Sequence, residues 1–159
     1  MHLPMSEPTP ADPGFADRVR ASFARQAAMA TLGAQLEAVE PGRVVIGMAY
    51  RSELTQQHGF IHAGIVATAL DSACGYAAST LMPADAAVLT IEFKVNLLAP
   101  ALGPWLHFEG LVTKAGRTIT VADGRAWQSA SGAERSGAKL VATMTATIMT
   151  VTGREGVKH

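Results

Sequence analysis

The apolar residues of this 159-residue chain follow a helical period in two segments, and beyond the second segment the period changes to two. One apolar stripe predicts an amphipathic helix over residues 13–30, with Asp12 as its N-cap and Gly33 at its end. A second helix is predicted over residues 64–81, where nearly every residue is apolar. A helix that is apolar nearly all round is buried in a folded protein.

Strand patterns flank this second helix. Two strands are expected before it and four after it, at residues 33–40, 43–51, 89–97, 104–114, 117–129 and 138–151. Short turns join the later strands, which favours antiparallel pairing because parallel strands need long crossovers. We therefore expect an α+β fold in which one curved antiparallel sheet wraps around the long central apolar helix, with an additional N-terminal helix.

The length suits a single domain with a sizeable core. We expect that domain at residues 12–152, preceded by a flexible tail at 1–11 and followed by a C-terminal tail at 153–159. A loop rich in Ser, Gly and Ala is expected at 129–137.

The charge balance narrows the classes of function. With 13 basic and 13 acidic residues, the chain lacks the basic footprint of a nucleic-acid-binding protein, and its neutrality weakly favours self-association. Cys74 is the single cysteine, which fits a reducing compartment, and the N-terminus does not resemble a signal peptide. Polar residues in the almost uncharged stretch 54–84 argue against a membrane span. We expect a cytoplasmic protein with no nucleic-acid or membrane partner.

Asp71 is the most informative residue. It is the only Asp, Glu, Lys or Arg between Glu53 and Asp85, and it lies inside the apolar helix. A carboxylate is costly to bury unless it is paired or used in chemistry. It could act as a general base or as a nucleophile, or it could be a structural acid satisfied by neighbouring hydroxyl groups.

Ala63-Gly64 opens the same helix. Small residues at a helix start let a ligand approach free backbone N–H groups, as in an oxyanion hole, although a tight turn needs the same residues. Gly64 and Asp71 share a helix face but lie about 10 Å apart along the axis, too far to serve one carbonyl group. If both are catalytic, we expect an obligate dimer in which Asp71 of one subunit faces Gly64 of the other.

Other side chains of this stretch have simpler interpretations. His58 and His62, with Asp71 or His107, could form a metal site, but they precede the helix and do not share one of its faces, so we expect no metal. We expect His62 to hydrogen-bond the backbone of the turn. Cys74 has no evident activating base, so a buried structural role is expected for it.

The segment GFIHAGIVATALDSACGYAA resembles the signature of hot-dog-fold thioesterases of the phenylacetate-degradation (PaaI-like) type. That signature has His-Gly-Gly before an apolar helix, with an Asp nine residues after the His, which is the spacing of His62 and Asp71. The stretch TIEFKVNLLAPALG is similar to the family's next strand, and the order of elements matches over residues 33–151.

The resemblance implies hydrolysis of an acyl-CoA or aroyl-CoA thioester, without a cofactor, by a homodimer within a homotetramer. By family analogy, Asp71 is the base or nucleophile, and the backbone N–H at Ala63 polarises the thioester carbonyl. Gln56 helps to hold the carbonyl or the water, and Thr90 assists the water. Ala63 stands where the family usually has Gly, which keeps the N–H but adds a methyl group. The predicted binding residues are His62 and Gly64, with Lys114 and Arg117 as candidates for the phosphates of CoA.

Three alternatives stay open at this stage. A hydroxyacyl thioester dehydratase on the same fold would pair a His base with an acid across the interface. In a non-enzymatic acyl-CoA binding protein, Ala63 would mark the loss of a catalytic site. A metal-binding protein would be recognised by its metal content.

Overall fold

A computed structural model describes residues 7–130 and 136–157. Its elements are α1 (Phe15–Arg25), α2 (Ala27–Leu32), β1 (Gln35–Glu40), β2 (Arg43–Ala49), the short 3₁₀ helix η1 (Ser52–Leu54), α3 (Ala63–Ser79), β3 (Ala87–Leu97), β4 (Trp105–Ala115), β5 (Ile119–Ser129) and β6 (Lys139–Val151). Residues 1–6, 131–135 and 158–159, which belong to the predicted tails and to the predicted loop 129–137, lie outside the described residues.

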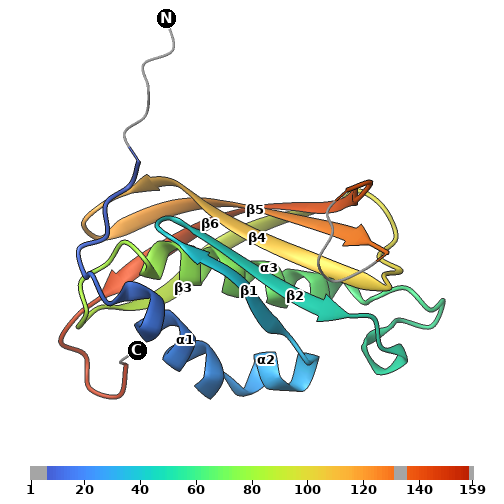
Figure 1. The fold of residues 1–159 in the computed structure, drawn as a ribbon, viewed down its shortest axis with the longest axis horizontal. Coiled ribbons are helices and arrows are strands. Elements are labelled where there is room, and N and C mark those ends of the chain that lie inside the picture. Colours follow the sequence, from blue (N-terminus) through green and yellow to red (C-terminus); the bar gives the residue numbers. More distant parts are fainter. Residues whose placement is uncertain (1–6, 131–135, 158–159) are drawn as a thin grey trace, which may run out of the picture.

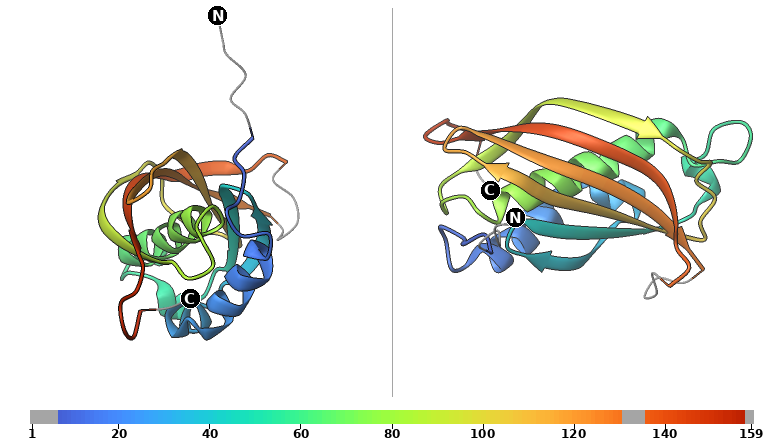
Figure 2. Two further views of the ribbon diagram at one scale, coloured as in Figure 1. Left: turned by 90° about the vertical axis from the view of Figure 1, so that its left-hand side faces the viewer. Right: turned by 90° about the horizontal axis from the view of Figure 1, so that it is seen from above.

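The six strands form one antiparallel sheet in the order β1-β2-β4-β5-β6-β3. The sheet curves around α3, while α1 and α2 lie on the side of α3 that the sheet leaves open (Figures 1 and 2). This arrangement confirms the expected α+β hot-dog architecture. Each predicted strand is present, with bounds that differ from the predicted ones by two residues or fewer.

Small residues let α3 lie directly on the sheet. Gly110 on β4 and Gly124 on β5 are register partners beneath the helix. A Cβ atom at Gly110 would overlap the backbone carbonyl of Ala73, and one at Gly124 would lie 3.1 Å from the sulfur of Cys74. On the helix side, Ala73 lies at this contact, and both Ala73 and Ala69 are fully buried. Close packing of this kind fixes the position of the helix relative to the strands.

The N-terminal helix differs from its prediction in two respects. It begins at Phe15 with Gly14 as the N-cap residue, because the Asp12 carboxylate accepts the Gly14 N–H at 2.9 Å and the Arg18 Nε–H at 3.0 Å. It is also interrupted at Gln26, whose backbone is extended (φ −78°, ψ 99°) between α1 and α2. Its end agrees with the prediction, since Gly33 is a left-handed C-cap with φ of 66°.

Strand β3 forms one edge of the sheet and exposes apolar side chains. Leu89, Ile91, Phe93 and Leu97 are 37%, 54%, 44% and 53% exposed. A β-bulge between Thr90 and Glu92 interrupts its pairing with β6. An unpaired edge that carries large apolar residues is a ready surface for another strand.

The face of the sheet that points away from α3 is largely polar. There, Glu37 of β1 accepts hydrogen bonds from Trp105 Nε1 at 2.7 Å and pairs with His107 Nδ1 at 2.6 Å, and His107 Nε2 lies 2.9 Å from Ser129 Oγ. Glu37 reaches across β2 because Gly47 leaves room: a Cβ there would overlap the Glu37 carboxylate. These contacts connect β1 with β4 and β5.

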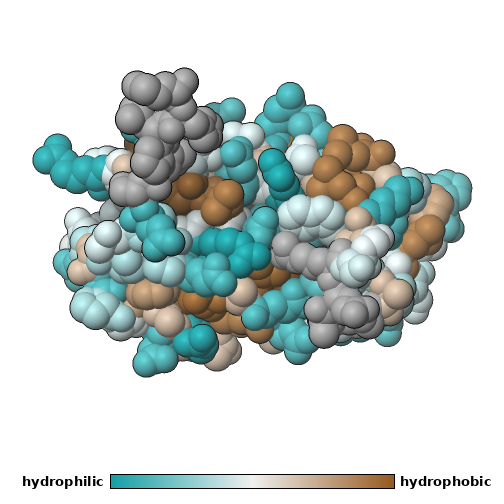
Figure 3. All heavy atoms as spheres, turned by 45° about the horizontal axis from the view of Figure 1, so that its top comes forward, coloured by the Kyte–Doolittle hydropathy of each residue, from teal (hydrophilic) through white to brown (hydrophobic). Residues whose placement is uncertain are grey.

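A space-filling view shows hydrophilic residues over much of one face of the molecule, with smaller apolar areas between them (Figure 3).

Candidate active site

The N-terminus of α3 presents a backbone donor. His62 is the N-cap residue, and its Nδ1 accepts the Gly64 N–H at 2.9 Å, which confirms the expected turn contact. The N–H groups of Ile65 and Val66 donate to the His62 carbonyl oxygen at 2.9 and 3.2 Å. Ala63 is the first helical residue, and its N–H has no acceptor among the residues that the structure describes. Of the donors at this helix start, the Ala63 N–H is therefore available to a ligand.

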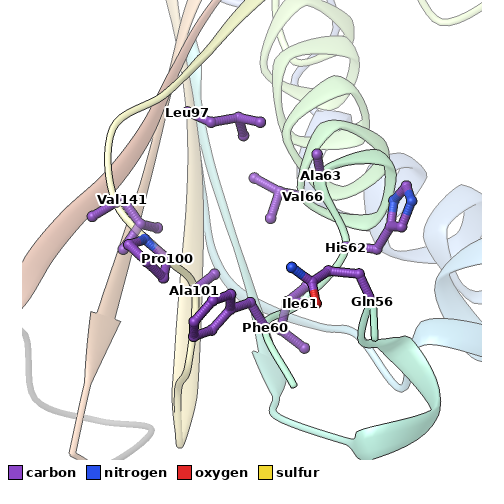
Figure 4. A pocket seen from close by; sticks show the side chains of 11 residues that line it. Gln56, Phe60, Ile61, His62, Ala63, Val66, Leu97, Pro100, Ala101 and Val141 are labelled. Atoms are coloured by element: carbon purple, nitrogen blue, oxygen red, sulfur yellow. The ribbon is translucent and has the colours of Figure 1, made fainter. Parts of the chain in front are cut away.

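A cavity of about 400 Å³ lies beside this donor. Its walls are mainly apolar, and Gln56 directs its carboxamide into it while the His62 ring points away (Figure 4). The Gln56 side-chain oxygen accepts the backbone N–H of His58. The full lining comprises Gln56, Phe60, Ile61, His62, Ala63, Val66, Leu97, Ala99, Pro100, Ala101 and Val141. The structure thus brings Gln56 and Ala63 together, as the family resemblance implied.

Asp71 lies in a different cavity, of about 300 Å³, two turns further along α3. Thr90 of β3 lines the same cavity, so these two predicted residues are also together. The Asp71 Oδ1 atom is buried and has no hydrogen-bond partner among the described residues. A buried acceptor without a partner destabilises a fold by about 1–3 kcal/mol, so native proteins keep few of them. Such an atom is a candidate for contact with a ligand or a reacting water.

The two groups of predicted residues are therefore separate within one chain. Gln56 and Ala63 line the first cavity, and Asp71 and Thr90 line the second. The edge strand β3 borders both, since Leu97 lines the first cavity and Thr90 the second. The helical offset of residues 64 and 71 predicted this separation.

The predicted CoA contacts lie elsewhere on the chain. Arg117 lines a cavity of about 250 Å³ at the far end of α3 with Met82 and Pro83, and Lys114 is an exposed residue of β4. Neither lines the cavities of Ala63 and Asp71. Their role in CoA binding stays a prediction.

Cys74 is fully buried in α3, as expected. Burial, and to a lesser extent the negative charges of Asp71 and Asp123, raise the pKa of its thiol to about 12. The thiolate is therefore rare near neutral pH, which agrees with the buried structural role expected for Cys74.

The described part of the chain has neither a cluster of metal-ligating side chains nor a membrane-spanning helix. Over residues 7–130 and 136–157, no group of three or more His, Cys, Asp or Glu side chains could hold a metal ion. Within the same ranges, no helix is long and apolar enough to cross a membrane.

Two residues of the Asp71 cavity carry no signal in the sequence pattern. Gln26 and Tyr76 line it together with Asp71 and Thr90. Gln26 accepts a hydrogen bond from Ser72 Oγ at 3.3 Å, and the Tyr76 hydroxyl lies 3.3 Å from Ser22 Oγ. Both contacts join the N-terminal helices to α3 across more than 40 residues of sequence, a separation that helical or strand periodicity does not report.

Comparisons with known proteins agree with this architecture. The thioesterase superfamily model matches residues 58–133. A crystal structure of a thioesterase family protein from Silicibacter pomeroyi is 56% identical and superposes with a TM-score of 0.83, covering 88% of this chain and all of that one. The chain belongs to the thioesterase superfamily.

Two further proteins are similar to parts of this chain. The E. coli PaaI protein from the phenylacetic acid degradation operon shares the fold, with a TM-score of 0.76 at 19% identity, covering 87% of this chain and 94% of that one. A Saccharolobus solfataricus protein, provisionally named an esterase, is 36% identical over 85 residues, which are 54% of this chain and 60% of the relative. The chain thus spans about three fifths of that relative's length.

Proposed function

We propose that this protein hydrolyses an acyl-CoA or aroyl-CoA thioester to the free acid and CoA, at a site built by two subunits. One observation carries the proposal: the backbone donor at Ala63 and the unpartnered carboxylate oxygen of Asp71 line separate cavities that share the exposed edge strand β3. Membership of the thioesterase superfamily supports the reaction class.

A second copy of the chain can supply the missing half of each site. If β3 pairs with β3 of a twofold-related subunit, antiparallel pairing sets the Leu97 end of one strand against the Leu89 end of the other. The Ala63 cavity of one subunit then lies beside the Asp71 cavity of its partner. The pairing also covers the exposed side chains of Ile91 and Phe93. We propose this dimer as the minimal active unit, and a homotetramer built from two such dimers in the cytoplasm.

In the proposed reaction, the Ala63 side and the Asp71 side of the shared site have different roles. The Ala63 N–H donates to the thioester carbonyl oxygen and stabilises the negative charge that develops there. The Gln56 carboxamide holds the same carbonyl group or the attacking water, and the Thr90 hydroxyl orients the water beside Asp71. His62 and Gly64 keep the turn in the conformation that directs the Ala63 N–H outward, through their own hydrogen bond. CoA leaves as the thiol, and we assign its phosphates to Lys114 and Arg117.

Two routes are open to the Asp71 carboxylate. As a general base it takes a proton from water, and the hydroxide adds to the carbonyl carbon. As a nucleophile it forms a mixed anhydride and releases CoA, and water then cleaves the anhydride. Single-turnover hydrolysis in ¹⁸O-labelled water separates the routes, because cleavage of an anhydride at the Asp71 carbonyl places the label in this side chain.

A panel of CoA thioesters, short and long, aliphatic and aromatic, tests the proposal with release of free thiol as the readout. We expect turnover of at least one class, and loss of nearly all of it in Asp71→Asn, which keeps the side-chain shape. Asp85→Asn, at an exposed aspartate outside both cavities, is the matched control. Full activity in Asp71→Asn would contradict the assignment. Water release from a 3-hydroxyacyl thioester would favour the dehydratase, and tight binding without turnover would favour the binding protein.

A further inference from the structure

The break between α1 and α2 has no local cause. Arg25, Gln26 and Ala27 are all compatible with a helix, and neither Pro nor Gly occurs among residues 15–32. The apolar stripe also continues through the break, which is why the sequence predicts one helix. We therefore attribute the extended backbone of Gln26 to a tertiary contact that the local sequence does not report.

That tertiary contact points into the candidate active site. The Gln26 side-chain oxygen accepts the Ser72 hydroxyl at 3.3 Å, and Ser72 is adjacent to Asp71 on α3. Gln26 lines the cavity that also holds Asp71 and Thr90. Gln26 follows Ser22 by four positions, on the side of α1 that contacts Tyr76, and from there its carboxamide reaches this cavity.

The carboxamide brings hydrogen-bond donors to that cavity. Its oxygen is occupied by Ser72, while its two N–H groups have no acceptor among the residues of 7–130 and 136–157. The Gln26 nitrogen is also not among the buried polar atoms that lack a partner, so it is accessible, and the residue lines the cavity. Val88, Leu89 and Gly75 line other parts of the same cavity and offer no side-chain donor.

We propose that Gln26 is a specificity-determining residue that donates a hydrogen bond to an oxygen atom of the acyl chain. This inference rests on the proposed function, because it takes the Asp71 cavity as the place of the acyl group. The site then favours acyl groups that carry an oxygen acceptor beyond the thioester carbonyl over hydrocarbon chains of the same length. Binding the hydrocarbon leaves the Gln26 donors without a partner, which is the source of the discrimination.

The test is equilibrium binding of thioether analogues of CoA, which cannot be hydrolysed. Two matched pairs place a ketone oxygen at successive positions: S-butyl-CoA against S-(3-oxobutyl)-CoA, and S-pentyl-CoA against S-(4-oxopentyl)-CoA. A ketone only accepts hydrogen bonds, so the Asp71 carboxylate cannot account for a preference. We expect the full-length protein to bind the ketone of at least one pair about three- to tenfold more tightly than the hydrocarbon.

Gln26→Met removes the donors and keeps a long, unbranched side chain. We expect it to abolish the ketone preference, while Gln35→Met, at an exposed glutamine of β1, preserves it. Equal affinity for both members of each pair in the unmodified protein, or an unchanged preference in Gln26→Met, would overturn the proposal. This experiment measures binding and does not depend on turnover. If the protein hydrolyses no thioester but still shows a ketone preference that depends on Gln26, the result supports this inference and contradicts only the proposed function.

Discussion

The substitution Ala63→Pro removes the proposed oxyanion donor and little else. Ala63 is the first residue of α3, where proline is well tolerated because the N–H at this position has no partner within the helix. His62 before it has φ −60° and ψ 138°, the extended conformation that a residue before proline prefers. No hydrogen bond between described residues is lost, so we expect the free energy of unfolding to change by less than about 1 kcal/mol.

The expected effect on catalysis is much larger. Loss of one oxyanion-hole donor lowers kcat by about 10²- to 10³-fold, or about 3–4 kcal/mol of transition-state stabilisation. The measurement is steady-state thiol release from the best substrate of the panel, with chemical denaturation as the check on folding. Ala63→Gly keeps the N–H and is the matched control, for which we expect activity within a few-fold of the unmodified protein. A folded Ala63→Pro variant with more than about a third of the original kcat would refute the role of this N–H.

Further predictions concern stability and reactivity. With its pKa at about 12, the buried Cys74 thiol should resist iodoacetamide at pH 8 in the folded protein and react after unfolding in urea. Mass spectrometry measures the alkylation, and rapid alkylation of the folded protein would contradict the burial of Cys74. Gly110→Ala should lower the free energy of unfolding by about 2–3 kcal/mol, because its Cβ would overlap the α3 backbone. Gly75→Ala, whose Cβ meets its nearest neighbour at an ordinary 3.8 Å, should instead be neutral or stabilising in the same urea titration. The hydrogen bond from Arg18, and then that from the Gly14 N–H, lower the pKa of Asp12 below its ordinary 3.8. The ionised Asp12 carboxylate therefore contributes its full stabilisation above pH 3.8, and this stabilisation is lost as the pH falls through the lower pKa of the folded state. The difference in free energy of unfolding between the unmodified protein and Asp12→Asn should therefore disappear in acid.

Much of the fold could be predicted because its signals are local. The change from helical to two-residue periodicity marks where α3 gives way to strands, and short turns predict antiparallel pairing. The lone charge at Asp71 points to a candidate site, which stays a prediction, and its offset from Gly64 predicted that the helix start and Asp71 lie apart. Each inference needs only the geometry of one helix or one strand.

The features that the sequence did not reveal depend on distant contacts. The break at Gln26 is tied to Ser72, 46 residues away, and the apolar stripe continues through it. The alternation of apolar and polar residues in β3 predicts a strand. Its position at the edge of the sheet, with exposed apolar residues, depends on the order of all six strands and is not visible in the alternation. No periodic pattern in the sequence relates the exposed residues Lys114 and Arg117 to a particular cavity.

The central claim is that each site combines Ala63 of one subunit with Asp71 of the other, and subunit mixing tests it most directly. Asp71→Asn and Ala63→Pro are each expected to be almost inactive when pure. Unfolded together in equal amounts and refolded, half of the dimers are mixed, and each mixed dimer holds one site with both groups intact, so about a quarter of the unmodified activity should return. If the two groups acted within one chain, no mixed dimer would hold an intact site, and the mixture would stay as inactive as the separate variants.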